Sequence, residues 1–117
     1  MKIAFLADPL SGFKTYKDST FAMMREAARR GHAVYAFEQR DMVLEEGVVS
    51  AKVARIHLTG DATDWYRADP AEEVSLSAFD AIIERKDPPF DMEYVYGTYL
   101  LELAERQGAR VFNRPSA

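Results

Sequence analysis

The sequence predicts a single α/β domain in which a mostly parallel, doubly wound sheet is flanked by helices on both faces. Three observations lead to this prediction. The chain has 117 residues, a length typical of one domain. Its apolar residues gather in short continuous runs, as they do in strands that are buried on both faces of a parallel sheet. The order strand, Asp-Pro loop, helix, glycine, strand occurs twice, and this alternation favours helices that cover a parallel sheet.

The first of these units begins at the N-terminus. The run Lys2–Ala7 predicts a buried strand that ends at Asp8-Pro9. A helix is expected from about Thr20 to Arg30, because Gly31 can adopt the left-handed conformation that ends a helix. Ala33–Phe37 is the next strand, and the crossover between the two strands should be right-handed. The helix face expected to be buried consists of Phe21, Met24 and Ala28.

The second unit occupies the C-terminal part of the chain. Ala81–Ile83 predicts a buried strand, and Arg85–Asp91 is the loop that follows it. A helix is expected from about Met92 to Gln107, where Gly108 can end it. Arg110–Asn113 is then a terminal strand, so the two units together predict about four parallel strands.

The segment between the two units predicts a β-hairpin insertion in this sheet. Residues 42–58 are rich in β-prone residues on both sides of Glu46-Gly47, a pair suited to a hairpin turn. Residues 60–77 are polar and carry no clear periodicity. Trp65 and Tyr66 are the side chains expected to anchor that polar stretch to the core.

Composition and residue counts exclude several classes of function. Lys and Arg number 15 against 19 Asp and Glu, so the net charge of −4 disfavours nucleic-acid binding. The absence of cysteine excludes disulfides, thiolate zinc sites and a catalytic thiol. The six glycines are scattered along the chain, so no phosphate-binding loop is predicted. The two histidines are far apart, and neither lies near a pair of carboxylates at the spacing of a metal site. The apolar start stops at Asp8-Pro9, too early for a signal peptide or membrane span, which predicts a cytoplasmic protein without membrane attachment.

The predicted binding site lies where the two Asp-Pro loops meet. Both loops, 8–20 and 85–91, follow parallel strands directly, and ligands collect at the carboxyl ends of such strands. Arg85 offers a planar fork for a carboxylate on a loop stiffened by Pro88-Pro89. An ion pair between Arg85 or Lys86 and a neighbouring acid, such as Asp8, is the alternative explanation. Ser19-Thr20 can contact a ligand oxygen or, alternatively, cap the helix.

Three segments of the chain resemble a known family. They are Asp8-Pro9, the run Lys17–Met23 (KDSTFAM) and, most specifically, the run Arg85–Asp91 (RKDPPFD). Together with the closing run Val111–Pro115, they are similar to the N-terminal domain of bacterial glutathione synthetase. The resemblance extends over residues 1–117 and implies a Rossmann-like, pre-ATP-grasp domain.

This resemblance implies an ATP-dependent ligase that joins glycine to γ-glutamylcysteine through an acyl phosphate. ATP and Mg²⁺ would be bound by C-terminal ATP-grasp domains that are absent from this chain, so the chain is either part of a longer enzyme or an independent copy of its first domain. The chain alone is expected to be inactive, with no catalytic or metal-binding residue. Its expected role is to bind γ-glutamylcysteine through Arg85, with Lys17, Asp18, Ser19 and Thr20 as further contacts. Association into a homo-oligomer is left open.

Two other classes of protein remain as alternatives at this point. Residues 28–34 also resemble the helix–strand junction in the N-terminal, acceptor-binding domain of two-domain glycosyltransferases, although those proteins usually have a glycine-rich first loop. A free-standing regulatory module with Asp8 as phosphoacceptor is the other alternative. Such a module needs further acidic residues at the strand ends, and no such set can be placed in the sequence.

Overall fold

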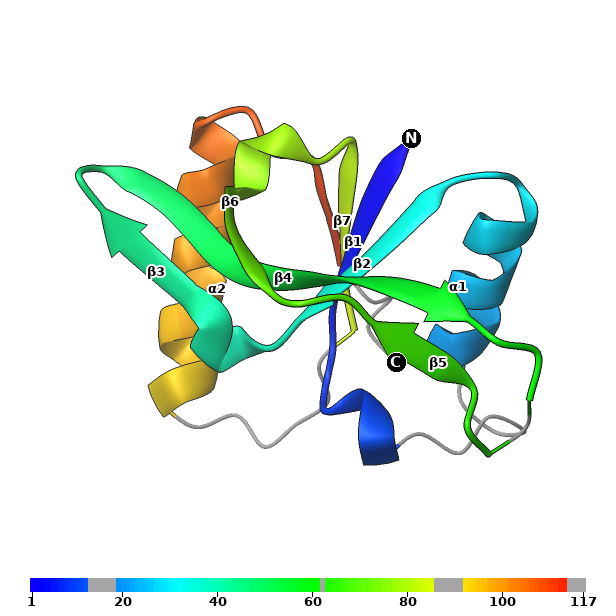
Figure 1. Ribbon diagram of the computed structural model, residues 1–117. Coiled ribbons are helices and arrows are strands. Elements are labelled where there is room, and N and C mark those ends of the chain that lie inside the picture. Colours follow the sequence, from blue (N-terminus) through cyan, green and yellow to red (C-terminus); the bar gives the residue numbers. More distant parts are fainter. Residues whose placement is uncertain (13–18, 62, 86–91, 114–117) are drawn as a thin grey trace.

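The computed structural model describes residues 1–12, 19–61, 63–85 and 92–113. Figure 1 shows a sheet whose central strands lie between two helices, α1 (Ser19–Arg29) and α2 (Met92–Arg106). The strands are β1 (Lys2–Leu6), β2 (Ala33–Phe37), β3 (Met42–Glu45), β4 (Val48–Leu58), β5 (Tyr66–Ala68), β6 (Glu72–Ser75), β7 (Ala81–Glu84) and β8 (Val111–Asn113). Short 3₁₀ turns follow β1, β2 and β6, at η1 (Leu10–Gly12), η2 (Gln39–Asp41) and η3 (Leu76–Ala78).

The two strand–helix–strand units form the parallel part of the sheet, as predicted. Its strand order is β2-β1-β7-β8, and each neighbouring pair is parallel. β1 therefore lies inside the sheet, with Leu6 paired to Phe37 of β2 and to Glu84 of β7. The predicted helices and strands of these units agree with the observed ones to within one residue at each end.

The two helices cover opposite faces of the parallel strands. Ala4 and Leu6 of β1 pack in one apolar cluster with Leu100 and Leu101 of α2. Ile3 and Phe5, the alternate residues of the same strand, pack with Met24 and Ala27 of α1. Burial on both faces explains why β1 is a continuous apolar run. The expected face of α1 was wrong at one position, because Ala28 is exposed and its neighbour Ala27 is buried.

The predicted mostly parallel sheet is wrong, because β4 makes the sheet mixed. Among the described strands three pairs are parallel, and four pairs, all involving β4, are antiparallel. β4 has 11 residues, about twice the length of a typical strand. Its first half pairs with β3 and β6, and its second half pairs with β2 and β5.

The two halves of β4 bury opposite faces. Val49, Ala51 and Val53 in the first half belong to the cluster under α2. Ile56 in the second half belongs to the cluster under α1. The first half thus joins β3 and β6 in an extension of the sheet toward α2, visible at the left of Figure 1. The predicted hairpin at Glu46-Gly47 is confirmed, and both residues have positive φ, 51° and 80°, as in a type I′ turn.

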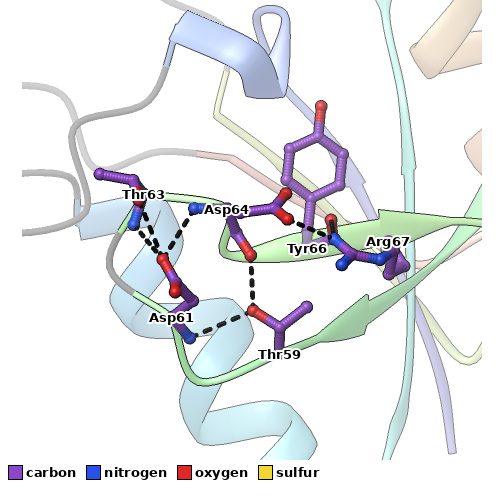
Figure 2. Close-up of polar contacts among 6 residues, drawn as sticks. All are labelled: Thr59, Asp61, Thr63, Asp64, Tyr66 and Arg67. Atoms are coloured by element: carbon purple, nitrogen blue, oxygen red, sulfur yellow. Dashed lines mark hydrogen bonds and ion pairs between the residues drawn. The ribbon is translucent and has the colours of Figure 1, made fainter.

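Trp65 anchors the turn between β4 and β5, as the sequence predicts. Figure 2 shows how the turn is closed: Asp61 Oδ1 accepts hydrogen bonds from the backbone N–H groups of Thr63 and Asp64, at 2.8 and 2.9 Å. The same backbone donors lower the pKa of Asp61. Trp65 is only 3% exposed and meets the ring of Phe21 edge to face, at 5.0 Å between centroids. The turn therefore packs directly on the first turn of α1.

Candidate substrate-binding site

At the carboxyl ends of the parallel strands, the two crossover connections lead to opposite sides of β1. From β1 the chain passes through α1 to β2, and from β7 it passes through α2 to β8, on the opposite side of β1. Ligands of open α/β sheets bind at such a switch point. Arg85 is the first residue after β7, and its backbone N–H donates to the carbonyl of Leu6 at 2.7 Å. Arg85 is thereby held between the ends of β7 and β1.

The side chain of Arg85 joins two of the predicted site residues. Its Nε donates to Thr20 Oγ1 at 3.2 Å, and its Nη2 donates to Ser19 Oγ at 2.5 Å. Thr20 is 5% exposed and belongs to the first turn of α1. The guanidinium has five N–H donors, so further donors remain for a ligand oxygen. The other explanation, an ion pair of Arg85 or Lys86 with a neighbouring acid, is not tested, because Lys86 and several acidic residues of the two loops lie outside the described residues.

The other predicted site residues lie outside the described residues. These are Lys17 and Asp18 in the first loop, and the loop 86–91 with its two prolines. Their contribution to the site stays a prediction. Of the five predicted substrate contacts, the structure brings together Arg85, Ser19 and Thr20.

Glu84 precedes Arg85 but lies on the other face of the sheet. It follows Ile82 by two residues on β7, and Ile82 packs in the cluster under α2. Side chains alternate along a strand, so Glu84 points toward the α2 side and Arg85 toward the α1 side. Burial raises the pKa of the Glu84 carboxyl. Glu84 and Arg85 therefore do not face the same ligand, although they are adjacent in the sequence.

A cavity of about 320 Å³ opens beside the switch point, and the sequence did not indicate it. It is bounded by the end of β1, the end of β2, the middle of β4 and the start of β5. Its polar lining residues are Asp8, Ser11, Glu38, Asp41, Lys52 and Tyr66. Ala36 and Ala54, which line it, come together only through the pairing of β2 with β4, and that pairing could not be read from the sequence.

The two histidines lie away from this edge and serve local contacts. His57 Nε2 lies 3.0 Å from the carboxylate of Asp69 on the exposed side of β4. His32 Nδ1 lies 3.2 Å from the N-terminal amine. Across the described part of the chain, no group of three or more His, Asp or Glu side chains could hold a metal ion. In the same residues, no helix has the length and apolar character needed to cross a membrane.

Comparison with known proteins places the whole chain in one family. The family described as "Prokaryotic glutathione synthetase, N-terminal domain" matches residues 1–117. A glutathione synthetase of Ralstonia nicotianae is 59% identical over 100% of this chain and 36% of its own length. One of Nitrosomonas europaea is 51% identical, covering 98% of the chain and 37% of the relative. A glutathione synthetase of Vibrio cholerae is 44% identical over 100% of this chain and 37% of its own length.

The chain thus spans a little over a third of the length of the curated relatives that it matches. These relatives give no support to the glycosyltransferase or the regulatory module as alternatives. The family match over residues 1–117 and the identities of these relatives agree with one assignment. The chain belongs to the prokaryotic glutathione synthetase family, and over residues 1–117 it is the N-terminal domain of that family.

Proposed function

We propose that this chain is the peptide-binding domain of a glutathione synthetase. In the complete enzyme, glycine is joined to γ-glutamylcysteine with ATP through an acyl phosphate. The ATP-grasp domains that follow in the longer protein bind ATP and Mg²⁺, and the reaction takes place in the cytoplasm. Membership of the family and the length of its curated members support this proposal.

The observation that carries the proposal is the fixed orientation of Arg85 at the switch point. A guanidinium forms paired, charge-assisted hydrogen bonds with a carboxylate. Its hydrogen bonds to Ser19 and Thr20 reduce the freedom of the side chain before a ligand binds. We infer that Arg85 binds a carboxylate of γ-glutamylcysteine and positions the peptide for reaction.

The described residues fit the binding of a peptide better than that of a nucleotide. Among them there is no metal-binding cluster, and the glycines form no loop of the kind that surrounds phosphates. ATP supplies the phosphoryl group that activates the carboxyl of the cysteinyl residue. Glycine then attacks the acyl phosphate and phosphate leaves. The role of this chain is to hold the peptide through both steps, and Arg85 contributes by binding a substrate carboxylate.

The proposal is tested with Arg85→Ala in the complete enzyme. Loss of a charge-assisted hydrogen bond costs roughly 1.5–3 kcal/mol, which corresponds to a roughly 10- to 100-fold decrease in kcat/KM for γ-glutamylcysteine. The KM for ATP should change little. Arg85→Lys should restore only part of the activity, because an ammonium lacks the planar fork.

A matched control is Arg110→Ala, since Arg110 is exposed and precedes β8 at the opposite end of the sheet. It should leave both KM values unchanged. A purely structural role of Arg85 gives a different result: the melting temperature of Arg85→Ala falls while kcat and the KM for γ-glutamylcysteine stay as in the wild type. That result would remove Arg85 from the site.

A further inference from the structure

The described residues cover only part of one face of the parallel strands. Parallel strands are normally buried on both faces, because helices lie over each face. On the face opposite α2, the buried residues of α1 pack with Phe5 of β1, Val34 of β2 and Ile56 of β4. Of β7, Ile83 is partly buried against this cluster, and Phe112 of β8 belongs to neither apolar cluster. Among the described elements, no helix therefore lies over the α1 face of β7 and β8.

The floor of this uncovered surface is apolar. Phe112 is paired with Ile83, and paired residues of neighbouring strands point to the same face. Ile83 packs on the α1 side, so Phe112 also points to that side, where it is 55% exposed. Its neighbour Val111 points the other way and packs under α2. An exposed aromatic ring thus lies on the sheet where a doubly wound domain has a helix.

The flank of α1 that borders this floor is apolar as well. Thr20 contacts Arg85 at the end of β7, and Phe21 contacts Trp65 on the other flank of α1. Met23 follows Thr20 by three residues, and residues three apart in a helix lie on the same side. Met23 therefore faces the β7 side, and it is 38% exposed. The β7–β8 surface is the name used below for Met23, Ile83 and Phe112 together.

The uncovered part has the width of one helix. The strand order is β2-β1-β7-β8, and α1 connects β1 to β2. Adjacent strands lie about 4.8 Å apart, so the middle of β7 and β8 lies about 9.6 Å from the middle of β1 and β2. Packed helices lie about 8–10 Å apart. A second helix therefore fits beside α1 and over β7 and β8.

The family match indicates which segment lies next to this surface. It places the chain at the N-terminal end of proteins of which it spans a little over a third. In such a protein the remaining chain follows β8, which ends at Asn113 and forms half of the floor. A segment that starts at the end of β8 is present at a high effective concentration beside it, because its binding is intramolecular.

We propose that the β7–β8 surface is the docking site for the segment of the complete protein that follows β8. This segment binds as a helix with an apolar stripe, packs between Met23 and the strand floor, and buries Phe112. The proposal goes beyond the proposed function and does not depend on the substrate, since it is based on burial and topology. A second copy of the chain on this surface, or an open surface, would contradict it.

The test measures how fast a thiol at position 112 reacts with iodoacetamide in the complete protein. Residues 1–117 contain no cysteine, so Phe112→Cys places a single thiol in this domain. Mass spectrometry of the peptides distinguishes its labelling from that of any cysteine in the domains that follow. A thiol covered by a docked helix reacts only when the helix opens locally, which should slow the reaction at least roughly tenfold.

Tyr96→Cys is the matched control for this measurement. Tyr96 lies on α2, which covers the opposite face of the sheet, and its exposure of 57% is close to that of Phe112. The two thiols should react equally fast in urea, and in the native protein the thiol at position 112 should react at least roughly ten times more slowly. Equal native rates show an open surface and overturn the proposal. Protection at position 112 that is lost on dilution shows a second copy and also overturns it.

A second set of variants tests whether one segment covers both Met23 and Phe112. The thiol of Met23→Cys should also be protected in the complete protein. Adding Phe112→Ser should speed its labelling at least roughly threefold, because the docked segment loses apolar contact area. Tyr96→Ser, added instead, should leave the rate unchanged. A melting temperature close to that of Met23→Cys alone shows that the sheet is intact. In such a folded protein, a labelling rate at position 23 that Phe112→Ser does not change contradicts the proposal.

Discussion

At the scale of single residues, the site depends on side chains held by short-range contacts. Arg85 is oriented by two hydroxyl groups from α1, and its own backbone is tied to β1. Its neighbour Glu84 is in a different environment, because burial raises the pKa of its carboxyl. Far from the site, Arg29 and Arg30 hold the pKa of Glu26 at about 2. Glu26 is on the surface, so this shift has little consequence for stability.

The raised pKa of Glu84 predicts a pH-dependent effect of Glu84→Gln. A carboxyl with a raised pKa in the folded state favours folding when protonated, and that contribution is lost as the pH rises through the folded pKa. Above the folded pKa the wild type holds an ionised group in a partly buried position, so Glu84→Gln should be the more stable protein at the higher pH values. The difference should shrink below a pH of about 4, near the pKa of an unfolded glutamate. Urea denaturation of both proteins across this pH range measures it.

Glu102→Gln serves as the control for this comparison. Glu102 is exposed on α2, so its substitution should change stability equally at each pH. A constant difference between Glu84→Gln and the wild type from pH 3 to about pH 7, the interval over which glutamates ionise, would contradict the account of Glu84.

At the scale of elements, local signals were sufficient for the two strand–helix–strand units. Gly31 and Gly108 mark the helix ends, and doubly buried strands such as β1 are recognisable as apolar runs. β4 could not be predicted in the same way. Its pairing with four other strands depends on contacts between residues distant in the sequence, and its two halves bury opposite faces. The cavity was missed for the same reason, since Ala36 and Ala54 meet only through that pairing.

The hairpin between β3 and β4 gives a prediction at this scale. Gly47 has a φ of 80°, and nothing lies within 4 Å of a side chain built there, so the backbone conformation alone resists substitution. Gly47→Ala should lower the free energy of unfolding by about 1–2 kcal/mol, the cost of a left-handed conformation for a residue with Cβ. Chemical denaturation measures the loss.

Gly12→Ala is the matched substitution for this comparison. A Cβ at Gly12 also meets nothing within 4 Å, but its φ is outside the left-handed region. It should leave the free energy of unfolding unchanged or raise it slightly. Equal effects of the two substitutions would mean that the turn does not require a positive φ at Gly47.

At the scale of the whole molecule, the parallel strands and the two helices place the site, and the antiparallel strands shape it. The two strand–helix–strand units bring Arg85 to α1. The segment 42–75, for which the sequence predicted little beyond a hairpin, supplies the second wall of the cavity through β4 and β5. The position of Arg85 at the end of β7 could be predicted from the local sequence, and its role in binding stays a prediction. The cavity required the tertiary structure.

The central claim is that the peptide substrate binds across the carboxyl ends of β1, β2 and β7. The most direct test is a crystal structure of the complete enzyme with γ-glutamylcysteine bound. We expect a substrate carboxylate about 2.7–2.9 Å from the guanidinium of Arg85, as in other charge-assisted hydrogen bonds. A peptide bound entirely by the domains that follow, with no contact to Ser19, Thr20 or Arg85, would contradict the claim.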